Sequence, residues 1–163
     1  MTGGTSEPSD PYSLDAVDRE LLGLLQNEGR LGVTELGRRV NLSQPAVSAR
    51  IKRLERAGII TGYRAVVDPA RLGLTIHAVI RLRTTHARIP ACLEHFAGLP
   101  EVVGVYRLTG EDCFLLDVHT AGAARLEAVV DGIARFGPVT TSLVLRAYEP
   151  KAVEPPSPER RRP

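Results

Sequence analysis

The chain has 163 residues, 43% of them hydrophobic, and a formal net charge of +2. This length fits one medium domain or two small ones, and no apolar run approaches the ~20 residues of a membrane-spanning helix. Residues 1–12 lack the basic start and apolar run of a signal peptide and are expected to form a disordered arm. Two cysteines, Cys92 and Cys113, make no disulfide framework, which favours a reduced, cytoplasmic setting with both thiols buried or half-buried.

Three helices are predicted in the first third of the chain. Residues 14–25 have the apolar spacing of a helix, with Asp15 and Asp18 near its positive N-terminal end. Residues 33–40 predict a second, shorter helix, and a turn at residues 41–42 leads into a third. Two helices joined by a turn this short have the geometry of a helix-turn-helix.

The third helix has start and stop signals. Ser43 is predicted to be the N-cap, its hydroxyl accepting from a backbone N–H of the first turn, and Pro45 lies within that turn. Gly58 is predicted to end the helix. One face is apolar, and its members are Val47, Ile51 and Leu54.

The charge near this helix favours a nucleic-acid partner. Residues 30–64 contain eight basic and two acidic residues, a local charge of +6, so the remainder of the chain carries −4. Exposed Arg and Lys can neutralise phosphates, and polar side chains can read base edges in a major groove. A solvated helix whose charges serve only solubility is the alternative interpretation. The predicted contacts to double-stranded DNA are Ser43, Gln44, Pro45, Ser48, Ala49, Arg50, Lys52, Arg53 and Arg56.

The hydrophobic pattern changes after residue 63. Residues 64–74 predict a short strand, to about residue 68, and a connector. Residues 75–149 then follow the order strand, helix, strand, strand, helix, strand, which predicts a ferredoxin-like βαββαβ arrangement with both helices on one face of an antiparallel sheet. A partner subunit is expected to cover the other face. Residues 150–163 are rich in Pro and charge and are expected to form a disordered tail.

Four stretches resemble the Lrp/AsnC, or feast/famine, family of transcription regulators. They are LDAVD at 14–18, RIKRLERAGIITGY at 50–63, TGEDCFLL at 109–116 and TTSLVL at 140–145. The resemblance implies an α+β protein with a winged helix-turn-helix DNA-binding domain over residues 13–63. A wing strand and linker over 64–74 would join it to an αβ sandwich over 75–149 that binds an effector and forms oligomers.

The resemblance also implies a function, that of a sequence-specific DNA-binding transcriptional regulator without cofactor, metal or catalytic residues. Members of the family form dimers through their sheets, often assemble into octamers, and bind amino acids in clefts between dimers. An apolar or aromatic amino acid is favoured here. The implied effector-binding residues are Leu108, Thr109, Gly110, Glu111, Asp112, Cys113, Thr140, Thr141 and Ser142.

One departure concerns the contact to the effector's ammonium group. The family commonly has Asp where this chain has Cys113, whereas Asp112 stands one residue earlier and faces the other way on a strand. The contact could therefore come from Asp112 or from Glu111. Asp112 could equally serve only to form the turn.

Two other functions fit parts of the sequence. Some relatives decarboxylate tetrapyrroles with histidines of this region, but no spacing among the four histidines predicts a metal site with a carboxylate or thiol, and Cys92-x-x-His95 is a weak lone pair. A non-sensing architectural DNA-binding protein, with an empty effector cleft, is the third alternative.

Overall fold

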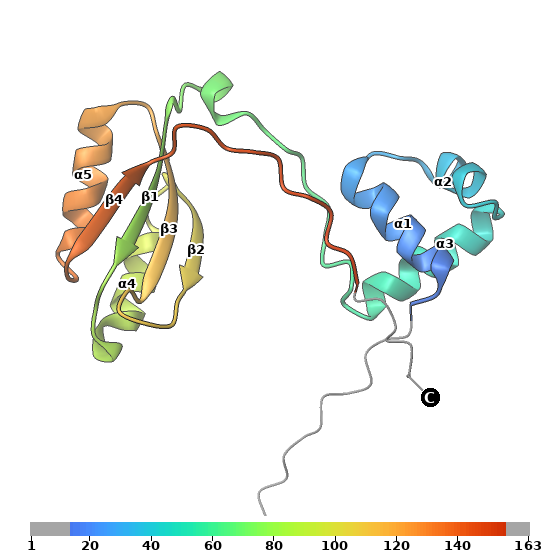
Figure 1. Ribbon diagram of the computed structural model, residues 1–163, viewed down its shortest axis with the longest axis horizontal. Helices are drawn as coiled ribbons and strands as arrows, with labels where there is room; N and C mark the ends of the chain where they lie inside the picture. The colour runs from blue at the N-terminus through green and yellow to red at the C-terminus, as the bar shows by residue number, and fades with distance from the viewer. Residues whose placement is uncertain (1–13, 156–163) are drawn as a thin grey trace, which may run out of the picture. The chain divides into compact units, whose positions relative to one another are not determined.

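The computed structural model describes residues 14–155, which form two compact units (Figure 1). Residues 14–65 and 149–155 make up the first unit, and residues 66–148 make up the second. None of the described helices is long and apolar enough to span a membrane. The predicted arm and residues 156–163 of the predicted tail lie outside the described residues.

The first unit contains the three predicted helices, α1 (Ala16–Asn27), α2 (Val33–Arg39) and α3 (Gln44–Arg56). Asp15 is the N-cap of α1 and forms a capping box with Asp18: each side chain accepts a hydrogen bond from the other's backbone N–H. Half-buried Leu42 packs against the shared core from the turn. The core residues are Leu21, Leu36, Val40 and Val47.

The turn between α2 and α3 depends on a close backbone approach at Gly37. A Cβ added to buried Gly37 would lie 2.6 Å from the carbonyl oxygen of Leu42, and the Leu42 N–H donates to the Gly37 carbonyl at 2.9 Å. Asn41, within the turn, has a positive φ of 53°, a conformation that Asn tolerates better than most residues. The helix-turn-helix geometry therefore requires glycine at position 37.

Gly37→Ala is expected to destabilise the first unit by about 1–3 kcal/mol, because the added methyl group must displace backbone rather than a flexible side chain. Chemical denaturation followed by helical circular dichroism measures the change. Gly23→Ala in α1 is the matched control, since its added Cβ meets nothing within 4 Å and helical alanine is favoured by roughly 0.5–1 kcal/mol. Equal effects of the two substitutions would contradict the close approach.

Both ends of α3 lie where the sequence predicts them, but one predicted hydrogen bond is not formed. Ser43 is the N-cap and Pro45 lies in the first turn, but the Ser43 side chain makes no capping hydrogen bond, so that predicted contact is wrong. Gly58, with φ of 70°, donates to the Glu55 carbonyl, and Ile59 donates to the Leu54 carbonyl. These two bonds form a Schellman motif that satisfies the last carbonyls of the helix.

Two predicted segments differ in the structure. Residues 64–68 are exposed and form no strand, so the wing strand is absent from the described chain. Residues 150–155 of the predicted disordered tail are described and contact α1. Gln26 and Val153 exchange two hydrogen bonds of 2.8 and 3.1 Å, and Arg19 donates to the Pro155 carbonyl at 3.4 Å. Gln26 therefore holds this segment against the helix.

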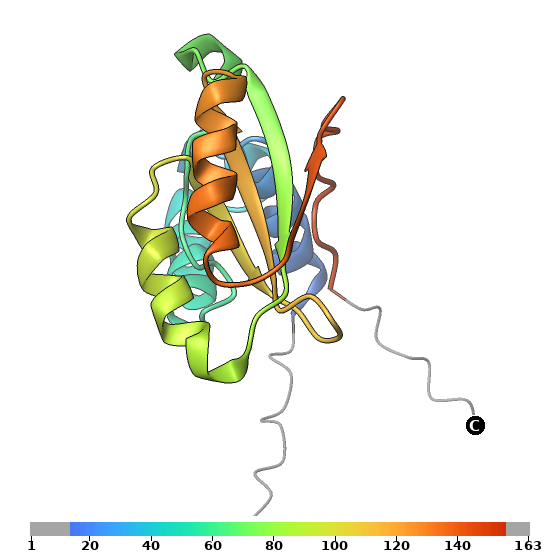
Figure 2. The same cartoon turned by 90° about the vertical axis from the view of Figure 1, so that its left-hand side faces the viewer.

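The second unit has the predicted βαββαβ order. Its sheet has the strand order β2-β3-β1-β4 with antiparallel neighbours, and both long helices lie on one side of it (Figure 2). The elements are η1 (Pro69–Leu72), β1 (Ile76–Leu82), η2 (His86–Arg88), α4 (Ile89–Ala97), β2 (Val102–Arg107), β3 (Phe114–Thr120), α5 (Ala123–Ala134) and β4 (Val139–Leu143).

Alternation along the central strands separates a core face from an open face. Alternate residues of β1 and β3 are buried beneath the helices together with Phe96 and Ile133. Cys92 is buried in this core and Cys113 is half-buried beside it, both as free thiols. Within the second unit no described helix covers the other side of the sheet. We define this open face by His77, Val79, Arg81, Leu115, Asp117 and His119.

Candidate DNA-binding and effector-binding sites

The helix α3 displays most of its predicted DNA contacts, but some already have protein partners. Ser43, Gln44, Pro45 and Ala49 are exposed, and Ser48 is half-buried. The Gln44 amide nitrogen donates to the Thr34 hydroxyl at 2.6 Å, which ties the start of α3 to the start of α2.

Arg50 and Arg53 join α3 to the N-terminus of α1. The Arg50 guanidinium contacts Asp15 at 2.6 Å and Asp18 at 2.9 Å, and Arg53 contacts the second oxygen of Asp18 at 2.7 Å. The Asp18 side chain has no exposed surface, whereas those of Arg50 and Arg53 are 27% and 46% exposed. A buried carboxylate is costly unless it is paired and hydrogen-bonded. These arginines therefore hold the domain together, a role that the sequence pattern did not predict.

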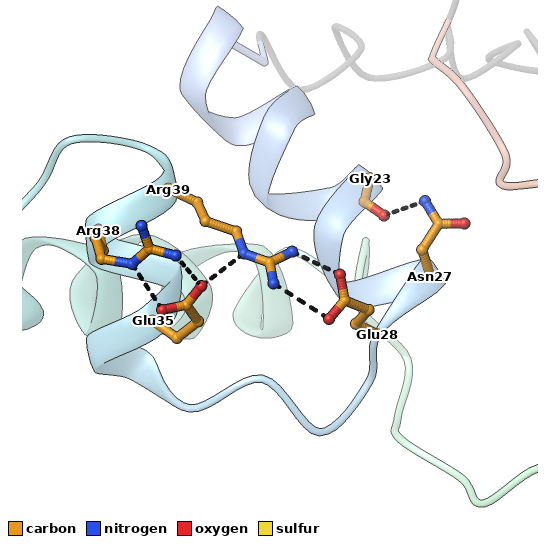
Figure 3. A network of polar contacts seen from close by, with 6 residues as sticks. All are labelled: Gly23, Asn27, Glu28, Glu35, Arg38 and Arg39. Atoms are coloured by element: carbon orange, nitrogen blue, oxygen red, sulfur yellow. Dashed lines mark hydrogen bonds and ion pairs between the residues drawn. The ribbon is translucent and has the colours of Figure 1, made fainter.

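The arginines of α2 are also paired. Arg38 and Arg39 both donate to Glu35, and Arg39 reaches on to Glu28, beyond the end of α1 (Figure 3). The hydrogen bonds from Arg38, and then those from Arg39, lower the pKa of Glu35 to about 2. The network links α1 to α2 at the surface, where such pairs contribute little stability individually.

These pairings correct the predicted charge excess. Nine basic and six acidic residues lie between 14 and 64, a balance of +3 rather than the +6 of the narrower window. The narrower window omitted acids that lie outside it in sequence but contact its arginines in the fold. Lys52 and Arg56 are exposed on α3 and have no acidic partner within 4.0 Å among residues 14–155. These two side chains are the best placed to meet phosphates.

The capping carboxylate Asp15 gives the first unit a pH dependence. A hydrogen bond from the Asp18 backbone N–H, and then one from Arg50, lower the pKa of Asp15 below its usual 3.8. A carboxyl group with a depressed folded-state pKa stabilises the fold above its unfolded value and loses that contribution as pH falls through the folded value. Thermal melts at pH 7, 4 and 3 are expected to show stability falling only below about pH 4. Asp15→Asn should show a shallower fall, and an equally steep one would contradict this assignment.

In the second unit, the predicted effector-binding residues 108–113 form the hairpin loop between β2 and β3. Leu108, Thr109, Gly110 and Glu111 are exposed, and Asp112 is half-buried. Gly110 has a φ of 103°, a conformation that favours glycine and forms the tip of the hairpin.

Both hairpin acids have arginine partners from β1 and its end. Glu111 forms an ion pair with Arg83, and an Asp112 oxygen lies 3.8 Å from Arg81. Arg81 and Arg83 are 46% and 53% exposed, so water screens these pairs and each contributes little stability. The arginines were missed by sequence reasoning, because only the register of β1 against β3 brings them to the hairpin.

Cys113 directs its thiol to the backbone. Its Sγ donates to the Thr84 carbonyl at 3.0 Å, and its N–H donates to the Leu82 carbonyl at 2.8 Å. Beside this contact lies an open pocket of about 590 Å³, which none of the nine predicted effector residues lines. Its lining residues are Arg83, Thr84, Thr85, Arg88, Phe136, Gly137 and Pro138.

The start of β4 lies at the same end of the sheet as the hairpin. Thr140 pairs with Arg81 of β1, and Arg81 pairs on its other side with Leu115 of β3. Thr140, Thr141 and Ser142 are all exposed. By alternation Thr140 and Ser142 lie on the open face and Thr141 on the opposite one.

Comparison with known proteins identifies both units. A model of the AsnC-type helix-turn-helix domain matches residues 14–55, and a model of the Lrp/AsnC ligand binding domain matches residues 77–153. The HTH-type transcriptional regulator LrpC of Bacillus subtilis is 34% identical over 125 residues, which cover 77% of this chain and 85% of that protein. The chain belongs to the Lrp/AsnC family. It is a transcriptional regulator with a helix-turn-helix DNA-binding domain and a ligand-binding domain.

Other Lrp/AsnC relatives agree in sequence and fold. The proline dehydrogenase transcriptional activator of Rhodobacter capsulatus is 39% identical over 121 residues, covering 72% of this chain and 78% of that protein. The structure of a Neisseria meningitidis transcriptional regulator in complex with L-Met superposes with a TM-score of 0.79 at 30% identity. That alignment covers 88% of this chain and 97% of the other. The predicted α+β fold class is thereby confirmed.

Proposed function

We propose that this Lrp/AsnC regulator binds double-stranded DNA through α3 in a manner that responds to an amino acid bound at the hairpin end of its sheet. The observation that carries the proposal is that the hairpin, the pocket and the β4 hydroxyl groups lie at one end of the sheet in the ligand-binding domain. The same chain displays Lys52 and Arg56 on α3. The related Neisseria regulator was solved with L-Met, which supports an amino acid as the effector class. The protein would act in the cytoplasm, where DNA and free amino acids are available.

The hairpin end offers partners for both charged groups of an amino acid. Exchange of the ion pairs of Glu111 and Asp112 would free a carboxylate for the ammonium group and a guanidinium, of Arg83 or Arg81, for the carboxylate group. Because Cys113 turns its thiol to Thr84, the two acids are the available ammonium partners. Phe136 and Pro138 in the adjoining pocket favour an apolar or aromatic side chain.

We propose that the open face is covered by a second copy of the chain. The face contains the apolar Val79 and Leu115, and no described helix of the second unit shields it. Dimers formed in this way could associate further, to octamers, with effectors bound between them. An effector that binds one assembly state more tightly than another would then shift the equilibrium towards the state that it binds more tightly.

Equilibrium titration of the full chain with the twenty amino acids tests the proposal. Thermal stability and sedimentation velocity are the measurements, and we expect one chemical group of amino acids to raise Tm and change the assembly state. Glu111→Gln with Asp112→Asn should abolish the response, whereas Glu127→Gln, an exposed change on α5, should not. If no amino acid changes either quantity, the sensor proposal fails and a non-sensing architectural role is favoured.

We propose a regulatory rather than enzymatic role, because the Bacillus and Rhodobacter relatives are named as a transcriptional regulator and a transcriptional activator, and the basic helix is intact. Incubation of the full chain with a tetrapyrrole tests the alternative directly. A colourless protein after gel filtration is the expected result. Co-elution of tetrapyrrole absorbance with turnover to a decarboxylated product would contradict it.

A further inference from the structure

Three side chains with metal-ligand chemistry converge on the open face of the sheet. His77 of β1 and His119 of β3 are direct register partners, and their rings stack with centroids 4.1 Å apart. Asp117 precedes His119 by two residues and so faces the same side of β3. The three ligand atoms all lie within 4.8 Å of one another. Sequence spacing did not predict this group, because His77 is 40 residues from Asp117 and only strand register brings them together.

A simple histidine–aspartate hydrogen bond accounts for part of this arrangement. The Nε2 of His77 lies 2.6 Å from the Oδ1 of Asp117, within hydrogen-bond distance. The Nε2 of His119 is 3.9 Å from the same oxygen, which is too long for a hydrogen bond. The His119 side chain is only 14% exposed and has no hydrogen-bond partner among the described residues. The His119 imidazole therefore lies next to the Asp117 carboxylate, although no hydrogen bond between them accounts for its position.

We propose that His77, Asp117 and His119 form a binding site for a divalent transition-metal ion of the Zn²⁺ type. Two imidazoles and one carboxylate are a ligand set that such ions favour. Because the second copy proposed above would cover this face, the remaining coordination position would face that copy. The site lies within the second unit, at a place distinct from the hairpin, and it does not depend on the amino-acid proposal.

The present spacing needs only side-chain adjustment to accept an ion. Ligand atoms that are each about 2.0–2.2 Å from a metal lie roughly 3–3.5 Å from one another. The Asp117 oxygen would withdraw from His77, and the longer separations, none above 4.8 Å, would shorten. The carboxylate supplies the negative charge that offsets part of the ion's charge. Since His77 and Asp117 stand on hydrogen-bonded neighbouring strands, binding would cross-link β1 to β3 on the open face.

Metal titration of the untagged full chain, stripped with EDTA and dialysed, tests the site. Calorimetry with Zn²⁺ is expected to give one ion per chain, and Zn²⁺ is expected to raise Tm by mass action. Co²⁺ is expected to give a visible d–d spectrum without a sulfur charge-transfer band, because neither Cys92 nor Cys113 belongs to the group. Uptake of no ion at micromolar Zn²⁺, or a sulfur charge-transfer band, would overturn the proposal.

Substitutions locate the ion. His77→Gln and His119→Gln should each weaken Zn²⁺ binding about tenfold or more, and the double variant should lose both binding and the Zn²⁺-dependent rise in Tm. His86→Gln is the matched control, since exposed His86 lies in η2, outside the group. Its binding should be unchanged. A folded double variant that binds like the wild type, or an equal loss in His86→Gln, would overturn the assignment.

Discussion

Replacing Arg50 and Arg53 together by methionine is expected to lower the free energy of unfolding of the helix-turn-helix unit by about 3–5 kcal/mol. The change leaves the fully buried Asp18 carboxylate without either of its guanidinium partners. Methionine retains the apolar stem and removes only the charge and the hydrogen bonds. The destabilisation would therefore report the uncompensated charge and not a cavity.

Hydrogen exchange of α1 and α3 amides measures this effect within one unit of the two-unit chain. Lys52→Met with Arg56→Met is the control, because neither residue has an acidic partner within 4.0 Å among the described residues. Its effect on stability should stay within about 0.5 kcal/mol. Adding Asp18→Asn to the arginine variant should restore part of the stability by removing the buried charge. A destabilisation no larger than that of the control would contradict the structural role of the pair.

The same Lys52 and Arg56 should dominate phosphate binding by α3. Removal of one phosphate-neutralising side chain is expected to reduce the slope of log K against log salt by about 0.9, equivalent to roughly fivefold in affinity at 0.15 M salt. Lys52→Ala with Arg56→Ala should therefore weaken DNA binding by more than about tenfold per recognition helix. The domain should remain folded, because neither side chain has an acidic partner within 4.0 Å among the described residues.

Fluorescence anisotropy with a fixed duplex over a range of salt concentrations measures both affinity and slope. Arg71→Ala with Arg135→Ala removes the same number of charges from the second unit and is the matched control. Its slope should be unchanged. If both pairs of substitutions weaken binding equally, the charge of α3 acts only through the net charge of the protein.

The sequence predicted the local elements well because local signals determine them. Caps, apolar spacing and turn residues located α1, α2 and α3 and the order of elements in the second unit. The strand predicted at 64–68 failed for the opposite reason: a short extended run becomes a strand only when another strand pairs with it. Charge counting failed similarly, because Asp18 lies beside Arg50 and Arg53 in the fold but 32 residues or more away in sequence.

The site residues also fall into two groups, those that local sequence signals place and those that only the fold brings together. Residue type and position placed Lys52 and Arg56 on the exposed face of α3. The register between paired strands determines the position of the remaining site residues. It brings Arg83 to Glu111 and His77 to Asp117, and no spacing along one strand contains that information. Functional groups assembled across strands are therefore the ones that sequence reasoning missed.

The most direct test of the central claim is operator affinity with and without effector. Selection from randomised duplexes would define a preferred sequence, and anisotropy would then measure its affinity for the full chain alone and with the amino acid identified by titration. We expect sequence preference together with a roughly 5–150-fold change in affinity on adding the effector, a coupling of about 1–3 kcal/mol. Equal affinity for selected and random duplexes, or no change with any amino acid, would contradict an effector-responsive, sequence-specific regulator.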